Sequence, residues 1–134
     1  MNGDAVTGAE GPGDAPPQRP GQRVPGPDDV GAVSVLQDAE RVRVVLAGEI
    51  DAACETDLRA AADRVLAAGL PVVVDVSRVG FMDSTGAAFL ARVAARLQPP
   101  LGPRSVTVVG ASAQVAFLLE VTLLDTYVVL EDPR

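Results

Sequence analysis

The chain has 134 residues, of which 48% are hydrophobic, and a formal charge of −7 with a sequence pI near 4.4. This length allows one domain with a sizeable core plus a tail. The acidic balance argues against a nucleic-acid or anionic-membrane partner selected by bulk electrostatics, because phosphate recognition relies on clustered Lys and Arg.

Two basic residue types are missing: all eleven basic residues are Arg, so the chain has no Lys and no His. This excludes phosphate-binding and Schiff-base lysines, the usual base of Ser and Cys hydrolases, and the commonest transition-metal ligand. We therefore predict no catalytic residue, no metal site, no cofactor and no enzyme activity. The single cysteine, Cys54, has no disulfide partner, which favours the reducing cytosol. No apolar run or leader indicates a membrane span or a signal peptide.

Residues 1–32 are rich in Gly and Pro, with scattered Asp and almost no large apolar side chains. Such a segment cannot bury enough surface to offset the entropy of ordering it. We therefore predict a disordered tail over residues 1–32 and one domain over residues 33–134. The tail is either a leader without a specific role or an arm that docks a partner.

The domain is predicted to open with a hairpin. Residues 33–36 are apolar, residues 41–46 alternate between polar and apolar, and the polar residues 37–40 between them suit a turn. Residues 48–51 then break the strand pattern. Apolar residues recur every three or four positions over residues 58–66, which predicts an amphipathic helix. This helix begins near Ala52 and ends at a Gly69 cap.

A β-branched run over residues 71–76 predicts a central strand covered on both faces. A loop leads to a second helix that stops at Pro99 and Pro100. A strand at residues 105–109, a helix with Ser112 as its N-cap, and an apolar run at residues 127–130 complete the chain. Strands and helices alternating after a hairpin predict an α/β fold: a mixed, mostly parallel sheet with about three main helices and right-handed crossovers.

The loop before the second helix is the most informative stretch, because it carries a hydroxyl at a helix start. Unpaired backbone N–H groups and the positive end of the helix dipole converge there, so the position suits an anionic group. Ser84 in the sequence Asp-Ser-Thr-Gly is therefore a candidate phosphorylation site.

Three short motifs in this order resemble the STAS domain, in the form of the bacterial anti-sigma factor antagonists. They are Gly-Glu-Ile-Asp at residues 48–51, Asp-Val-Ser at 75–77 followed by Phe-Met-Asp-Ser-Thr-Gly at 81–86, and Val-Gly-Ala-Ser at 109–112. The resemblance covers residues 33–130. It implies a single STAS-like domain with the strand and helix order predicted above.

The resemblance also implies a function. The phosphorylated serine of that family falls on Ser84, and its neighbouring acidic residue falls on Asp51. A partner anti-sigma factor, itself an ATP-dependent serine kinase, would bind the loop formed with Asp83, Thr85 and Gly86. The unmodified protein would hold this partner and free the sigma factor, phosphorylation would release it, and a serine phosphatase would reset the switch. No direct nucleic-acid or membrane contact is implied, and the oligomeric state stays open.

Each position also has a purely structural interpretation. Ser84 and Asp51 are both residues that cap helices. Thr85 suits a first-turn hydroxyl better than a second phosphosite. Asp83 suits hydrogen bonds to loop N–H groups, and Gly86 suits a close approach of loop and helix.

Two departures from the family pattern bear on the partner. Ala87 is small where the family has a large aliphatic residue, and Leu123 stands where a left-handed helix cap prefers Gly. The third helix is apolar on two faces, which indicates either a wide buried stripe or an exposed patch. The second interpretation slightly favours an alternative function, a non-switching STAS subunit of a larger assembly such as a lipid-transport complex or a stressosome-like scaffold.

Overall fold

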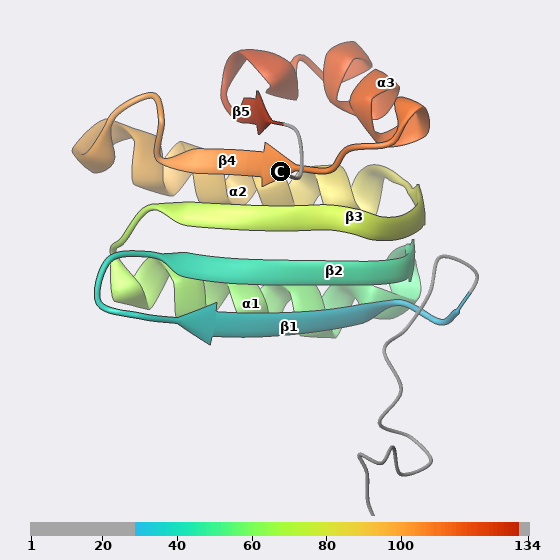
Figure 1. The fold of residues 1–134 in the computed structure, drawn as a ribbon, viewed down its shortest axis with the longest axis horizontal. Coiled ribbons are helices and arrows are strands. Elements are labelled where there is room, and N and C mark those ends of the chain that lie inside the picture. The colour runs from blue at the N-terminus through green and yellow to red at the C-terminus, as the bar shows by residue number, and fades with distance from the viewer. Residues whose placement is uncertain (1–28, 132–134) are drawn as a thin grey trace, which may run out of the picture.

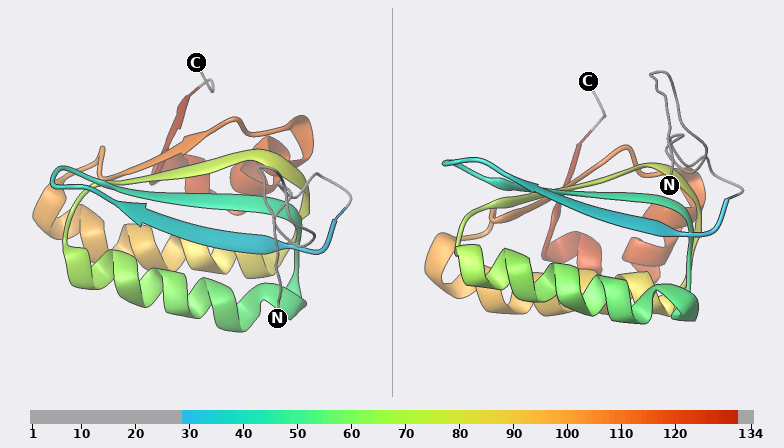
Figure 2. Two further views of the ribbon diagram at one scale, coloured as in Figure 1. Left: turned by 60° about the horizontal axis from the view of Figure 1, so that its bottom comes forward. Right: turned by 90° about the horizontal axis from the view of Figure 1, so that it is seen from below.

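A computed structural model describes residues 29–131 as one five-stranded sheet with helices. Strands lie in the order β1–β2–β3–β4–β5, with β1 antiparallel to β2 and each later pair parallel. Helices α1 and α2 cover one face, and α3 lies at the β4–β5 end of the sheet (Figures 1 and 2). The predicted mixed sheet and its element order are confirmed. Most of the predicted tail, residues 1–28, lies outside the described residues, as do residues 132–134.

The predicted hairpin is formed by β1 (Ala32–Gln37) and β2 (Val42–Ile50). In its turn, the Asp38 carboxylate accepts hydrogen bonds from the backbone N–H groups of Glu40 and Arg41, which lower the pKa of Asp38. The predicted break at residues 48–51 is wrong, because β2 continues to Ile50. Gly48 permits this with a φ of 79°, and the register shifts beside it mark a local bulge.

The chain before β1 lies against the end of β2. Val30 forms an isolated parallel bridge with Glu49, whose backbone N–H donates to the carbonyl of Asp29 at 3.1 Å. A Cβ atom at Gly48 would lie 2.5 Å from that carbonyl oxygen. This close approach, together with the positive φ, explains why glycine stands at this position.

The helix predicted over residues 58–66 is part of α1 (Glu55–Ala68), which follows a short 3-10 helix, η1 (Ala52–Cys54). Its buried side chains keep the predicted spacing. Gly69 ends it in the left-handed conformation, with a φ of 64° and an N–H that donates to the carbonyl of Val65. The predicted Gly69 cap is confirmed.

β3 (Val72–Met82) is longer than the predicted strand, because pairing with β2 continues to Met82. Only the face toward the helices is fully buried. Val73 and Asp75, on the opposite face, are half-buried, so the expectation of a strand covered on both faces is wrong. No helix of residues 29–131 covers that second face (Figure 2).

α2 (Ser84–Leu101) includes Pro99 and Pro100, so the predicted stop at these prolines is wrong. A proline in the last turn removes only a hydrogen bond to a carbonyl one turn earlier, and both prolines are exposed, so water can satisfy those carbonyls. The N–H of Gly102 closes the helix on the carbonyl of Gln98 at 2.7 Å.

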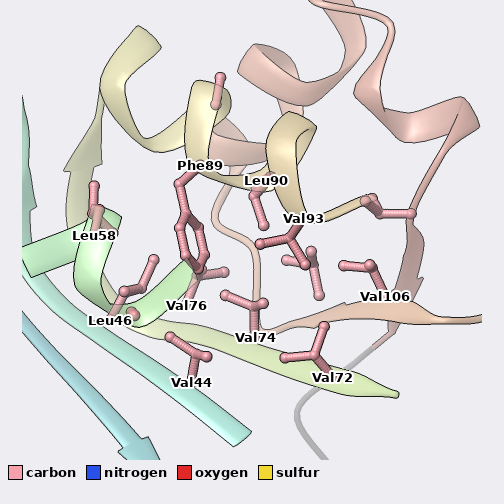
Figure 3. Close-up of a cluster of buried hydrophobic side chains, with 14 of the residues drawn as sticks. Val44, Leu46, Leu58, Val72, Val74, Val76, Phe89, Leu90, Val93 and Val106 are labelled. Atoms are coloured by element: carbon pink, nitrogen blue, oxygen red, sulfur yellow. The ribbon is translucent and has the colours of Figure 1, made fainter. Parts of the chain in front are cut away.

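The core lies between the sheet and the two long helices (Figure 3). Alternate residues of β2 and β3 point toward α1 and α2, as the period of two of a strand requires. Each fully buried Val, Leu or Phe side chain stabilises the fold by about 1.5–3 kcal/mol relative to exposure. The side chains at the centre of this layer are Val44, Leu46, Val74, Val76, Leu58, Phe89, Leu90 and Val93.

The last third of the chain contains β4 (Val106–Val109), α3 (Ala113–Val121), the 3-10 helix η2 (Leu124–Thr126) and β5 (Val129–Glu131). Ser112 caps α3, since its hydroxyl accepts from the N–H of Val115 at 3.2 Å. Of the two interpretations of this apolar helix, the structure supports the exposed patch. Phe117 is 63% exposed and Val121 57% exposed.

Within residues 29–131, no helix combines the length and the apolarity that crossing a membrane requires.

Leu123 follows α3 with a φ of 63°, in the left-handed region, and its side chain is 65% exposed. A residue with a Cβ atom is strained there by about 1–2 kcal/mol, and glycine is not. We expect Leu123→Gly to raise the free energy of unfolding by about 0.5–1 kcal/mol, because the greater freedom of glycine in the unfolded chain offsets part of the relief.

Urea unfolding followed by circular dichroism measures this difference. Leu123→Ala is the matched control, because it shortens the side chain but keeps the Cβ atom. Equal stability of the Gly and Ala variants would contradict the prediction.

Candidate functional site

The candidate site lies where β2 and β3 end side by side. Ile50 pairs with Met82 in the parallel register, and the N–H of Asp83 donates to the carbonyl of Ile50 at 3.1 Å. The next residues along the chain are Asp51 after β2, and Asp83 and Ser84 after β3. The structure therefore brings the two predicted acidic residues and the predicted phosphosite to one edge of the sheet.

Both aspartates cap helices. The Asp51 carboxylate accepts from the N–H of Ala53 at 3.1 Å, and the Asp83 carboxylate accepts from the N–H of Thr85 at 2.8 Å. The N-cap of α2 is thus Asp83, and Ser84 is the first helical residue, so the interpretation of Ser84 as the cap is wrong. Asp83 holds the loop by backbone N–H groups as expected.

The two hydroxyls of the loop differ in access. Ser84 is exposed, whereas Thr85 is half-buried. The Ser84 hydroxyl makes no hydrogen bond with any of the described residues, and Ser84 is the first residue of α2. Of the two residues, Ser84 is the more accessible to another protein. Its place in the first turn is beside the positive end of the helix dipole, which stabilises an anionic group.

Gly86 lets α2 pack closely on the end of β3. A Cβ atom at this position would lie 2.5 Å from Cγ and 2.7 Å from Sδ of Met82, which is fully buried. A larger residue at position 86 would push the helix start away from the strand. Gly86 therefore fixes where Ser84 stands.

Gln114 is a part of the site that the sequence patterns do not indicate. Its side-chain oxygen accepts from the N–H of Met82 at 3.0 Å, and its amide nitrogen donates to the carbonyl of Met82 at 2.8 Å. The pairing of β3 with β4 ends at Asp75, so Gln114 satisfies backbone groups that β4 does not reach. α3 is thereby fastened to the residue just before the Asp83–Ser84 turn.

A groove of about 520 Å³ runs between α1 and α2 from the site. Two ion pairs lie along it: Arg59 with Glu55 at 2.8 Å within α1, and Arg92 of α2 with Asp63 of α1 at 2.9 Å. The groove is lined by Glu55, Leu58, Arg59, Ala62, Ser84, Thr85, Ala88, Phe89 and Arg92.

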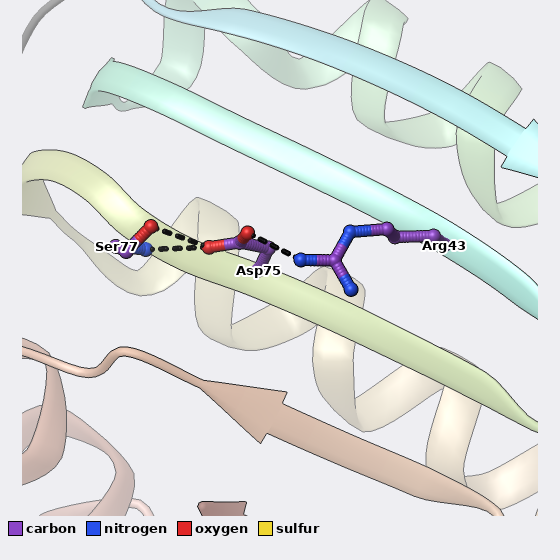
Figure 4. A network of polar contacts seen from close by, with 3 residues as sticks. All are labelled: Arg43, Asp75 and Ser77. Carbon is purple, nitrogen blue, oxygen red and sulfur yellow. Dashed lines mark hydrogen bonds and ion pairs between the residues drawn. The ribbon is translucent and has the colours of Figure 1, made fainter. Parts of the chain in front are cut away.

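Asp75 lies away from this groove, on the face of the sheet that the helices do not cover. Its carboxylate accepts from the N–H and the hydroxyl of Ser77 and pairs with Arg43 at 2.7 Å (Figure 4). Partial burial raises the pKa of Asp75, but the Ser77 hydrogen bonds and Arg43 outweigh it and hold this pKa below its usual value. Asp75 joins two strands and has a structural role.

Among residues 29–131, no three Asp, Glu, Cys or His side chains gather where they could hold a metal ion.

We expect Gln114→Leu to loosen the end of β3, because it leaves the N–H and the carbonyl of Met82 without partners. Stability should fall by about 1–3 kcal/mol, and the Met82 amide should exchange hydrogen faster. Hydrogen exchange resolved by residue measures this. Gln114→Glu keeps the acceptor and loses the donor, so its effect should be intermediate. Unchanged exchange at Met82 in the Leu variant would contradict the prediction.

The lowered pKa of Asp75 makes its contribution to stability depend on pH. A carboxylate with a depressed folded pKa stabilises the fold above its unfolded pKa, and this stabilisation is lost as pH falls through the folded pKa. We expect Asp75→Asn to be less stable than the natural protein at pH 7, with the difference closing below about pH 4. Denaturant unfolding across pH measures it. A difference independent of pH would refute the prediction.

Comparisons with known proteins agree with the fold. The family model described as Mlab, STAS domain, matches residues 33–131. The crystal structure of an anti-sigma factor antagonist from Mycobacterium paratuberculosis is 28% identical, with a TM-score of 0.68, and the match covers 83% of this chain and 92% of that one.

Two structures of the anti-sigma factor antagonist SpoIIAA are more distant. The unphosphorylated form is 20% identical with a TM-score of 0.63, covering 77% of this chain and 89% of its own. The phosphorylated form, from Bacillus, is 20% identical with a TM-score of 0.62, covering 77% and 92%. Curated proteins show no match. The predicted resemblance is confirmed by the family match and by the shared fold, and the chain belongs to the STAS domain family.

Proposed function

We propose that this protein is an anti-sigma factor antagonist switched by phosphorylation of Ser84. The unphosphorylated form binds a cognate anti-sigma factor that is also a serine kinase, and so frees the sigma factor. The proposal rests above all on one observation, the exposed Ser84 hydroxyl in the first turn of α2, beside Asp51. The likeness to the mycobacterial anti-sigma factor antagonist supports it. SpoIIAA, of the same fold, is known in phosphorylated and unphosphorylated forms.

In the phosphorylation step, Ser84 Oγ attacks the γ-phosphorus of ATP. The Oγ–P bond forms as the bond from this phosphorus to the β,γ-bridging oxygen breaks, and ADP leaves. The hydroxyl proton passes to a base. In this proposal the kinase partner supplies both the base and the groups that hold the nucleotide, since this chain has no Lys to hold its phosphates. The chain acts as a substrate and a binding module, with no cofactor and no catalysis of its own.

Charge explains the release of the partner. A phosphate adds about −1.5 to −2 charges to a turn that already carries Asp83 and starts beside the turn that carries Asp51. The start of α2 stabilises this charge within the domain. A partner surface that covers the loop, however, must remove the water around the phosphate, which costs free energy. A loss of about 3 kcal/mol of interface free energy lowers affinity more than a hundredfold. No large refolding is needed.

The remaining parts of the cycle follow from this role. A serine phosphatase removes the phosphate and restores binding. The switch operates in the cytosol, with no direct contact to nucleic acid or membrane.

A second candidate is a non-switching STAS subunit of a larger assembly. The observation that favours it is the exposed apolar side chains of α3, Phe117 and Val121. The two are four residues apart on α3 and so share one face of the helix, and adjacent exposed apolar side chains can mark a protein-interaction surface. In this function, Ser84 is only a first-turn residue and its hydroxyl is never modified.

We expect the purified protein to gain one phosphoryl group from its cognate kinase and ATP, and to lose at least a hundredfold in affinity for that kinase. Ser84→Ala should gain none and keep its binding. Thr85→Ala is the matched control and should be phosphorylated normally. Intact-mass analysis and calorimetry measure both properties.

Transfer of the phosphoryl group to a residue other than Ser84 would refute the switch. Capture of a large assembly equally by natural protein and by Ser84→Ala, with no modification of either, would favour the second candidate.

A further inference from the structure

The groove between α1 and α2 contains two arginines close to the proposed phosphosite. Its charged lining is Glu55 and Arg59 from α1 and Arg92 from α2. At its mouth, Asp83 caps α2 and Asp51 caps η1, the 3-10 helix that precedes α1, and Asp63 pairs with Arg92. A phosphate on Ser84 would therefore meet carboxylates at the mouth and guanidinium groups farther along.

The ion pair between Arg92 and Asp63 shows which residues of α1 and α2 lie side by side. Both helices follow parallel strands, β2 and β3, and so run in the same direction. Counting eight residues back from each partner reaches Ser84 on α2 and Glu55 on α1. These are the first residues of the two helices. Ser84 therefore stands across the groove from Glu55.

The Arg59 side chain extends toward the first turn of α1, where Glu55 lies. Helical side chains lean toward the N-terminus of their helix, and Arg59 Nη2 lies 2.8 Å from Oε2 of Glu55, one turn earlier. Both side chains are more than half exposed, so the guanidinium can turn without repacking the core. An exposed ion pair of this kind is worth at most about 1 kcal/mol. A stronger anion beside it can displace Glu55.

We propose that Arg59 is the phosphate partner within this chain: it pairs with Glu55 while Ser84 is unmodified, and turns to the phosphate once Ser84 is phosphorylated. This inference rests on the proposed phosphorylation of Ser84. The phosphate carries more charge than one carboxylate and offers three oxygens to the guanidinium fork. Glu55 is then left unpaired and repels the phosphate.

The exchange would extend the switch beyond the loop. In the unmodified protein the Glu55–Arg59 pair presents no net charge on α1. After the exchange, Glu55 stands free on the groove wall, and Arg59 is held at the start of α2. A partner that covers both helix starts would meet a changed charge pattern on α1 as well as on the loop, which adds to the discrimination between the two forms.

The test uses the full chain with phosphoserine installed at position 84 during translation, so that no kinase is needed. A ³¹P NMR titration reads the second ionisation of the phosphate. Arg59 favours the dianion of the phosphate. Arg59→Gln should therefore raise the proton affinity of the phosphate about threefold, as expected for the loss of an exposed ion pair. Glu55→Gln should lower it, since this variant removes both the competitor and a repelling charge.

Arg64→Gln is the matched control, because Arg64 lies on α1 and is exposed, but does not line the groove. It should titrate like the natural sequence. Equal titration of the Arg59→Gln and Arg64→Gln proteins would overturn the proposal. Failure of a kinase to modify Ser84 would instead count against the proposed function and leave this measurement unaffected.

Discussion

The parallel pairing of β2 with β3 is the interaction on which the rest of the site depends. Parallel strands end at the same edge of a sheet, and the register here sets Ile50 beside Met82. The turns that follow therefore start next to each other, and so do α1 and α2. A slip of this register by one residue would turn the buried face of β3 outward and separate Asp51 from Ser84.

Packing beneath this edge holds the turn in place. The buried Met82 side chain fills the space against Gly86, and the backbone of Met82 is bound by Gln114 of α3. The Asp83 cap then fixes the first turn of α2. The exposed hydroxyl thus stands on a rigid support, which suits a site read by another protein, since little ordering free energy is lost on binding. The same contacts connect α3, with its exposed apolar side chains, to the proposed phosphosite.

Local patterns predicted the elements well where a local rule decides the structure. Gly69 ends α1 and Ser112 caps α3, because each signal acts within one turn of the chain. The mixed, mostly parallel sheet follows from the alternation of strands and helices after the hairpin. The positions of Asp51 and Ser84 at one edge follow from the family motifs.

Tertiary contacts explain where prediction failed. In the sequence, Gly48 predicts the end of a strand. The strand continues because residues 29–31 pack beside it. Pro99 reads as a helix stop, yet an exposed last turn tolerates it. The contact of Gln114 with Met82 spans 32 residues, and no pattern in either segment indicates it. The groove arginines are likewise ordinary surface residues until the helices are placed side by side.

The bridge from Val30 to Glu49 also determines where the chain enters the domain. The chain enters at the edge of the sheet that carries Asp51 and Ser84, beside the end of β2, which the Asp51 turn follows. Residues 29 and 30 therefore lie beside the surface that a partner would cover. A fluorophore attached at the exposed position of Val30 would report the arrival of a partner, whereas one attached near Gly102, between the end of α2 and the start of β4, would not.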